Sequence, residues 1–148
     1  MNRLYIDMDG VLARFEQAHQ PLKRFAVEGG FFYSLEPTKF CRVLNRRLER
    51  EGAEGVYILT SSPNKQADKD KIAWIEKHVP MLADRVICVR SGEAKAQYAN
   101  EQAMLLDDYT ENLEFWVSKG GKACKALNGL NGKTKRYKEI AEMELVVD

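Results

Sequence analysis

The fold is decided by the stretch Leu4-Tyr5-Ile6-Asp7-Met8-Asp9-Gly10-Val11-Leu12, near the start of the chain. Its first three residues form an apolar run, which is typical of a strand buried in a parallel sheet. Asp7 and Asp9 follow that run, and Gly10 permits a tight turn. Because open α/β sheets bind ligands at the carboxyl ends of their strands, we expect both carboxylates at a binding edge. The alternative is a strand followed by an acidic turn.

Two carboxylates placed this close together repel each other unless a cation or a shared proton relieves them. A hard divalent cation such as Mg²⁺ prefers oxygen ligands. The pair Asp7 and Asp9 therefore predicts a Mg²⁺ site.

Composition restricts the class of protein. The chain has 148 residues, which suits one domain, and its net charge is +1. Since there is no basic excess, we expect neither a nucleic-acid polymer nor an anionic membrane as partner. We also expect no signal peptide and no membrane span, because the first residues read as a strand and no apolar run is long enough.

The cysteines indicate the compartment. Cys41, Cys88 and Cys124 are widely spaced and odd in number, and they form no Cys-x-x-Cys motif. This pattern argues against a disulfide framework or a zinc site and fits a reducing, cytoplasmic environment.

The segment that follows the first strand has helical patterning. Apolar residues at spacings of three and four predict a helix over residues 15–26, ended by Gly29 and Gly30. Thr38 is a candidate N-cap for a second helix that continues to about residue 50. Between them lies the aromatic trio Phe31-Phe32-Tyr33. We expect residues 14–54 to include a small cap over the carboxylates; the alternative is that the rings pack in the core.

A second apolar run, residues 56–59, ends in Thr60-Ser61-Ser62-Pro63. Hydroxyls and backbone amides at that point can hold phosphate oxygens, and a helix N-terminus with its cap is itself an anion site. The helix that follows reaches about residue 78 and carries Lys71 among other lysines. A third strand over residues 85–89 precedes a short helix that carries Lys95.

A further apolar run, residues 103–106, ends in Asp107-Asp108, so the acidic strand end recurs. We expect a helix over residues 111–118, a fifth strand over 123–127, a loop over 128–132 and a last helix over about 134–143. Strands that alternate with helices indicate an α/β fold with a doubly wound, mostly parallel sheet in one domain.

These strand ends resemble the motifs of the haloacid dehalogenase-superfamily phosphohydrolases. Asp7-Met8-Asp9-Gly10-Val11-Leu12 matches the first motif, Leu59-Thr60-Ser61 the second and Asp107-Asp108 the fourth. Within the superfamily the chain most resembles the 5'(3')-deoxyribonucleotidases. Phe15 sits where that family has a base-stacking phenylalanine, the segment 31–37 resembles its aromatic cap segment, Lys71 matches the third-motif lysine, and Lys95 matches a second family lysine.

The resemblance implies a Mg²⁺-dependent phosphomonoester hydrolase with a nucleotide as substrate. Asp7 would attack phosphorus and form an aspartyl-phosphate, while Asp9 would act as general acid and then general base. The implied Mg²⁺ ligands are the Asp7 carboxylate, the Asp9 backbone carbonyl and Asp108, with Asp107 acting through water. The implied phosphate-binding residues are Thr60, Ser61, Lys71 and Lys95. The implied substrate-binding residues are Phe15, Phe31, Phe32 and Tyr33.

Three alternatives remain open at this point. The enzyme could act on sugar phosphates or on nucleic-acid 3' ends. A catalytically inactive binding protein could share the fold, because fold does not fix function. A receiver-type signalling domain also has a doubly wound sheet and an aspartyl-phosphate, but it carries its phosphorylated aspartate after the third strand, where this chain has Val89 and Arg90.

Overall fold

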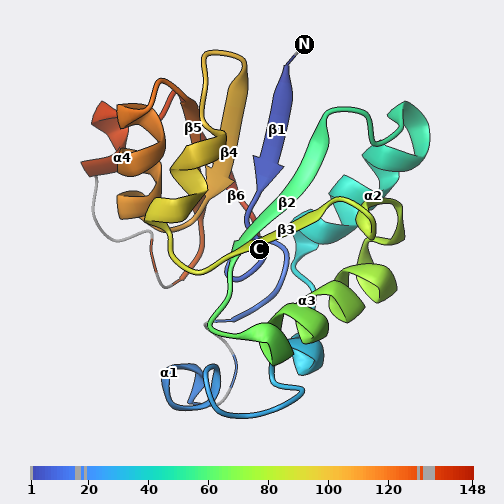
Figure 1. Cartoon of the computed structure of the whole chain (residues 1–148). Helices are drawn as coiled ribbons and strands as arrows, with labels where there is room; N and C mark the ends of the chain where they lie inside the picture. Colours follow the sequence, from blue (N-terminus) through green and yellow to red (C-terminus); the bar gives the residue numbers. More distant parts are fainter. Residues whose placement is uncertain (1, 16–17, 19, 130, 132–135) are drawn as a thin grey trace.

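The structure is a computed structural model, and it describes residues 2–15, 18, 20–129, 131 and 136–148. Six parallel strands form one sheet in the order β3-β2-β1-β4-β5-β6. The strands are β1 (Arg3–Ile6), β2 (Val56–Ser61), β3 (Val86–Val89), β4 (Ala103–Asp107), β5 (Lys122–Leu127) and β6 (Met143–Val146). This is the predicted doubly wound α/β architecture, and β1 lies inside the sheet (Figure 1).

The register brings the ends of three strands to the same level. Ile6 lies opposite Ile58 of β2 and Leu106 of β4. The residues that follow β1 and β4, together with the last residues of β2, therefore meet at one edge of the sheet. That edge collects the polar side chains of the first, second and fourth motifs.

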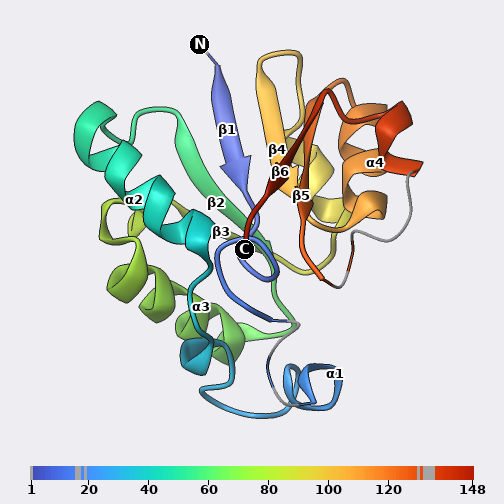
Figure 2. The ribbon, with the colours of Figure 1, turned by 180° about the vertical axis from the view of Figure 1, so that it is seen from behind.

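Helices cover both faces of the sheet. α2 (Lys39–Glu51) and α3 (Lys65–His78) lie on one face, and α4 (Thr110–Ser118) lies on the other with the 3₁₀ helix η3 (Glu93–Tyr98), as Figures 1 and 2 show. Alternate residues of β1 serve the two faces, because Ile6 packs with α2 and α3 while Tyr5 packs with Trp116 of α4. Within the described part of the chain, no helix has the length and apolarity that a membrane span needs.

The predicted last helix over residues 134–143 is wrong where the structure describes it. The 3₁₀ helix η4 covers only Arg136–Glu139, and β6 begins at Met143. Residues 134 and 135 lie outside the described residues. The apolar run after Glu144 completes the sheet instead: Leu145 pairs with Ala126 of β5, and Val147 is buried. Pairing with the open edge of β5 outweighs local helical preference here.

The predicted helix over residues 15–26 is also wrong. Its described part contains only α1 (Pro21–Arg24). Gln20 has a left-handed backbone with φ of 49°, and Pro21 begins the helix because proline suits the first helical turn. The phenylalanines whose spacing suggested a helix instead pack against one another. The Phe15 ring lies 6.1 Å from that of Phe25 and 6.4 Å from that of Phe32, so these rings form an aromatic cluster. Residues 16, 17 and 19 lie outside the described residues.

Hydrogen bonds tie the segment between β1 and α2 to α3. The buried Trp74 donates from Nε1 to the Leu35 carbonyl over 2.7 Å, and the Gly30 amide donates to Asp70 Oδ2 over 2.8 Å. α2 itself belongs to the layer that covers the sheet. The described chain before α2 includes the 3₁₀ helix η1 (Phe32–Ser34), which packs against α3. That the segment caps the carboxylates stays a prediction.

The N-cap prediction is confirmed, and it can be tested by stability. Thr38 is buried; its Oγ1 accepts from the Cys41 amide at 3.2 Å and donates to the Val11 carbonyl at 2.8 Å. Thr38→Val keeps the shape and removes both bonds, so we expect the free energy of unfolding in urea to fall by about 1–3 kcal/mol. Thr38→Ser, which retains the hydroxyl, should lose less. A valine variant as stable as the natural protein would contradict this account.

Candidate active site

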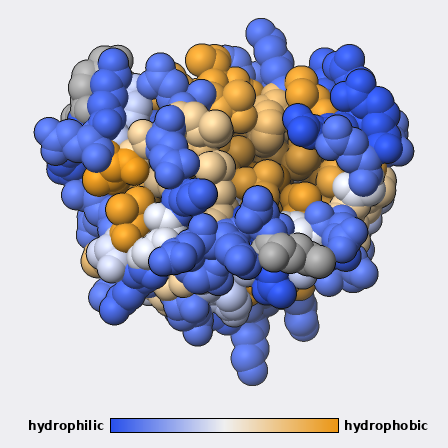
Figure 3. Space-filling view, turned by 90° about the horizontal axis from the view of Figure 1, so that it is seen from above, coloured by the Kyte–Doolittle hydropathy of each residue, from blue (hydrophilic) through white to orange (hydrophobic). Residues whose placement is uncertain are grey.

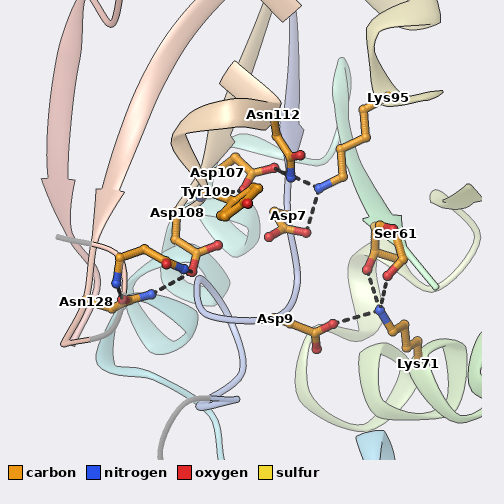
Figure 4. A network of polar contacts seen from close by, with 12 residues as sticks. Asp7, Asp9, Ser61, Lys71, Lys95, Asp107, Asp108, Tyr109, Asn112 and Asn128 are labelled. Carbon is orange, nitrogen blue, oxygen red and sulfur yellow. Dashed lines mark hydrogen bonds and ion pairs between the residues drawn. The ribbon is translucent and has the colours of Figure 1, made fainter. Parts of the chain in front are cut away.

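In the turn after β1, the residue between Asp7 and Asp9 belongs to the hydrophobic core, whereas the two acids do not. Met8, which stands between them, is fully buried in the hydrophobic cluster beneath α2 and α3. Its carbonyl accepts from the amides of Leu12 and Ala13 and closes the turn. The two acids therefore project at the edge of the sheet, and Figure 4 shows them directed to different partners.

Asp7, Asp107 and Asp108 form a buried acidic cluster. Each contributes a carboxylate oxygen to a group of atoms that all lie within 4.8 Å of one another. Burial raises the pKa of Asp7 well above its ordinary value, and the negative charge of Asp107 raises it further. Burial also raises the pKa of Asp108 to about 6, with Asp107 again adding to the effect. The cluster is therefore short of positive charge.

Lys95 supplies part of that positive charge. Its ammonium is buried and donates to Asp7 Oδ1 at 2.9 Å and to Asp107 Oδ2 at 2.8 Å. Burial opposes the charged form of Lys95, but Asp107 and Asp7 outweigh burial and raise the pKa of the ammonium. Lys95 is thus a permanent cation that joins the end of β1 to the end of β4.

The two acids of the fourth motif have different partners. Asp107 accepts from the Tyr109 amide on Oδ1, and from Lys95 and Asn112 on Oδ2. Asp108 accepts on Oδ2 from Asn128 at 2.9 Å (Figure 4) and, on the same oxygen, from Asn131 at 2.6 Å. Among the described contacts, Asp108 Oδ1 is therefore the less engaged oxygen of this pair of acids.

Residue 10 must be a glycine because its backbone lies against the Asp108 carboxylate. Its φ is +82°, and a Cβ built on it would lie 2.3 Å from Asp108 Oδ2. The Asn128 amide also bonds the Gly10 carbonyl at 2.8 Å. The glycine therefore lets the turn after β1 touch the acid that follows β4.

Asp9 belongs to a second group of contacts on the other side of the site. Lys71 of α3 is fully buried, and its ammonium donates to Asp9 Oδ2 at 2.7 Å, Thr60 Oγ1 at 2.8 Å and the Ser61 carbonyl at 2.6 Å. The same ammonium lies 4.4 Å from the centre of the Phe32 ring. The predicted phosphate-binding residues thus form two groups: Lys95 contacts Asp7, whereas Lys71, Thr60 and Ser61 gather around Asp9.

A cavity of about 280 Å³ opens beside Asp9. Phe15, Phe25 and Phe32 contribute aromatic rings to its lining. Ser61, Ser62, Pro63 and Arg90 also line it. The cavity therefore joins an apolar, aromatic side to the polar ends of β2 and β3.

The other two predicted aromatic residues lie elsewhere. Phe31 is buried, with its ring 5.2 Å from that of Phe32, and is not part of the described cavity lining. Tyr33 is 39% exposed, and its ring lies 5.4 Å from the Lys77 ammonium on α3. Of the predicted aromatic set, Phe15 and Phe32 are the rings at the cavity.

A second hollow, of about 420 Å³, lies at the opposite edge of the sheet. Leu4, Val56 and Met104, near the starts of β1, β2 and β4, contribute to its lining. Figure 3 shows hydrophobic residues gathered in a hollow at this end of the molecule. The acidic cluster is at the other end of the strands, so the smaller cavity is the one next to candidate chemistry.

Several polar residues of the site were not predicted. Asn128 directly follows β5 and Arg90 directly follows β3, so both had the signal that identified Asp7 and Asp107, a polar residue at a strand end. Lys125 is different, because it lies within β5 and is fully buried. It donates to the Asp108 carbonyl and to Thr110 Oγ1, and only the folded structure places it there.

Solved structures share this fold. D,D-heptose 1,7-bisphosphate phosphatase from Burkholderia thailandensis has a TM-score of 0.63 at 12% identity, over 100% of this chain and 92% of that one. A haloacid dehalogenase (HAD) family hydrolase from Deinococcus radiodurans, with bound phosphate and sodium, has a TM-score of 0.67 at 9% identity, over 98% and 90%. D,D-heptose 1,7-bisphosphate phosphatase from B. bronchiseptica, complexed with magnesium and phosphate, has a TM-score of 0.63 at 9% identity, over 99% and 93%.

The fold, with acids after β1 and β4, is that of the haloacid dehalogenase-superfamily phosphohydrolases. The profile of the family described as "5' nucleotidase, deoxy (Pyrimidine), cytosolic type C protein" matches residues 16–144. The chain belongs to this family and is a phosphatase, as the sequence motifs predicted. No curated protein sequence is similar enough to the chain to count as a match.

The contact between Gly10 and Asp108 gives a test of the site. Gly10→Ala places a methyl group against the Asp108 carboxylate, so we expect phosphatase activity on phenyl phosphate to fall by at least about tenfold, the effect of small displacements at catalytic centres. Gly52→Ala is the matched control, because Gly52 has φ of +83° with open space around its Cβ position. Equal activity in the two variants, with circular dichroism showing both folded, would contradict the proposed role of the close approach.

Proposed function

We propose that the protein is a Mg²⁺-dependent nucleotide phosphatase, similar to the 5'(3')-deoxyribonucleotidases, that works through an aspartyl-phosphate on Asp7. The observation that carries the proposal is the buried cluster of Asp7, Asp107 and Asp108, with Lys95 on one side and the Asp9–Lys71 pair on the other. Phosphate monoesters hydrolyse very slowly without help, so the site must supply a large part of about 20 kcal/mol.

The residues divide the chemistry between them. Asp7 attacks phosphorus and forms the aspartyl-phosphate as the bond to the leaving oxygen breaks, which splits one difficult step into two easier ones. Asp9 enters the first step protonated, gives that proton to the leaving oxygen, and then regains one from the water that hydrolyses the intermediate. Lys95 orients Asp7 through the bond to Oδ1. Thr60, Ser61 and Lys71 hold phosphoryl oxygens as charge redistributes.

The residues present fit a Mg²⁺ ion. The cluster holds three buried carboxylates, and burial raises the pKa of Asp7 and of Asp108. A hard cation stabilises such a group, and carboxylate oxygens are the donors that Mg²⁺ prefers. The Asp7 carboxylate, the Asp9 carbonyl and Asp108 would hold the ion, with Asp107 contributing through water. When bound, Mg²⁺ neutralises the charge of the anionic nucleophile and the anionic phosphate.

The first experiment removes the nucleophile. Asp7→Asn keeps the size of the side chain but replaces the attacking carboxylate, so we expect kcat on phenyl phosphate to fall at least about a thousandfold. Asp84→Asn makes the same chemical change at an exposed position away from the site and serves as the control. Near-natural turnover in a folded Asp7→Asn variant would rule out the covalent mechanism.

The second experiment concerns the metal. EDTA should abolish turnover and Mg²⁺ should restore it, because the carboxylates otherwise repel the substrate. Since the described hydrogen bonds to the Asp108 carboxylate both fall on Oδ2, we expect Asp108→Ala to raise the Mg²⁺ concentration for half-maximal activity more than Asp107→Ala does. Calorimetric titration with Mg²⁺ gives a readout that does not depend on turnover. A larger effect from Asp107→Ala would reverse the assignment of the direct ligand.

The lining of the cavity supports a nucleotide as substrate. Phe15 and Phe32 offer ring faces or edges beside Asp9, where the leaving group would lie. Stacking a base on an aromatic side chain contributes about 1–3 kcal/mol. The family profile, whose description reads "5' nucleotidase, deoxy (Pyrimidine)", supports this choice of substrate. We therefore favour a deoxynucleoside monophosphate, with preference for pyrimidines, over sugar phosphates and nucleic-acid 3' ends.

The third experiment tests the substrate class. Phe15→Ala should lower kcat/KM on a deoxypyrimidine monophosphate by about tenfold relative to phenyl phosphate, which is the loss of one stack. Phe115→Ala is the matched control, because Phe115 is half-buried on α4, on the other face of the sheet, and does not line the cavity; its loss should affect both substrates alike. An equal loss on both substrates in Phe15→Ala would end the nucleotidase proposal and leave the phosphatase activity.

The remaining expectations concern the cellular setting. The three cysteines are free, which agrees with a reducing compartment, and we propose a cytoplasmic location. The partner is a small phosphomonoester.

A further inference from the structure

Arg90 is a charged residue at the cavity to which the mechanism gives no role. It follows Val89, the last residue of β3, and so reaches the same edge of the sheet as the catalytic acids. It lines the cavity together with Asp9, Phe15 and Phe32. A group that leaves from a phosphate beside Asp9 and enters this cavity would therefore come close to the arginine.

Asp68, in the first turn of α3, holds Arg90 in place. Nη1 donates to Asp68 Oδ1 at 2.9 Å, and Nη2 donates to Asp68 Oδ2 at 2.8 Å. Nη1 also lies 3.4 Å from the Ser62 carbonyl at the end of β2. Two parallel bonds fix the plane of a guanidinium, which is why such pairs give geometric specificity. The hydrogen bonds from Arg90 also lower the pKa of Asp68, so that carboxylate stays ionised near neutral pH.

The pair leaves hydrogen-bond donors available. Among the described residues, the Nε–H of Arg90 and one Nη2–H have no recorded acceptor. The Arg90 side chain is 50% exposed, and it lines the cavity. The arginine can therefore donate to a ligand without breaking its contact with Asp68.

The charge of the pair decides which ligand suits it. Asp68 offsets the positive charge of Arg90, the cation among the described residues that line the cavity, so the lining offers hydrogen-bond donors without a net positive charge. A second phosphate near this pair would lie close to the Asp68 carboxylate, with no unpaired cation among the described lining residues to offset the repulsion. An uncharged acceptor, such as a carbonyl oxygen of a base, meets no such repulsion.

We propose that Arg90, held by Asp68, is a specificity-determining residue that donates a hydrogen bond to an uncharged carbonyl oxygen of the substrate's base, and that the Arg90–Asp68 pair disfavours substrates with a second phosphate. This inference rests on the proposed nucleotidase function. Arg90 lies outside the four motifs and would contact the leaving group of the substrate.

The first test compares two substrates. The probes are 2'-deoxyuridine 5'-monophosphate, whose base carries carbonyl oxygens, and phenyl phosphate, whose leaving group has none. Arg90→Met keeps the aliphatic stem and removes the donors. We expect it to lower the ratio of kcat/KM values, nucleotide over phenyl phosphate, by about tenfold, the size of one hydrogen bond from a charged group. Arg47→Met is the control, because Arg47 pairs with Glu51 on the exposed side of α2.

The second test reverses the charge preference. Asp68→Asn leaves the charge of Arg90 uncancelled, so kcat/KM on 2'-deoxyuridine 3',5'-bisphosphate should rise several-fold relative to the monophosphate. An Arg90→Met variant with an unchanged substrate ratio overturns the inference, and so does an Asp68→Asn variant with no gain on the bisphosphate. If the natural protein itself shows no preference for the nucleotide over phenyl phosphate, the proposed function fails as well, so the two failures are distinguishable.

Discussion

The contact that the rest of the site depends on is the bridge from Lys95 to Asp7 and Asp107. Three carboxylates are buried within reach of one another, and buried charges are costly unless they are paired and hydrogen-bonded. The ammonium of Lys95, itself buried, lies 2.9 Å from Asp7 and 2.8 Å from Asp107. It therefore allows β1 and β4 to end side by side in acids, and the charge deficit that remains is what a divalent cation would relieve.

A second buried lysine gives the site its two sides. Lys71 holds Asp9 and the end of β2, so each lysine serves one acid of the first motif. The spacing of these lysines along the chain does not say which acid each contacts, because α3 and η3 reach the edge from different directions. The cavity opens on the Asp9 side, away from the acidic cluster. In the proposed mechanism, this asymmetry would separate the group that attacks phosphorus from the space that receives the leaving group.

Most of the sheet could be predicted from the sequence, because five of its strands are short, mainly apolar runs. Parallel pairing then brings the polar residues that follow these runs to one edge of the sheet. The sixth strand could not be predicted, since Met143–Val146 has no local preference as strong as its pairing with β5. The helix expected over residues 15–26 failed because spaced phenylalanines cluster equally well around a turn at Gln20. Lys125 lies within β5 and reaches Asp108 through a contact that only the fold creates, whereas Asn128 stands at a strand end and could have been found from the sequence. The family was evident from motif order, whereas the roles of the two lysines needed the structure.

The central claim is that Asp7 carries the phosphoryl group during turnover. It is tested most directly by mixing the enzyme, Mg²⁺ and an excess of substrate, quenching in acid within the first turnovers, and analysing the proteolysed protein by mass spectrometry. The account predicts a phosphorylated aspartate in the peptide that contains Asp7, absent when the substrate is omitted. A phosphoryl group found on any other residue, or turnover with no labelled peptide under conditions that trap acyl phosphates, would contradict it.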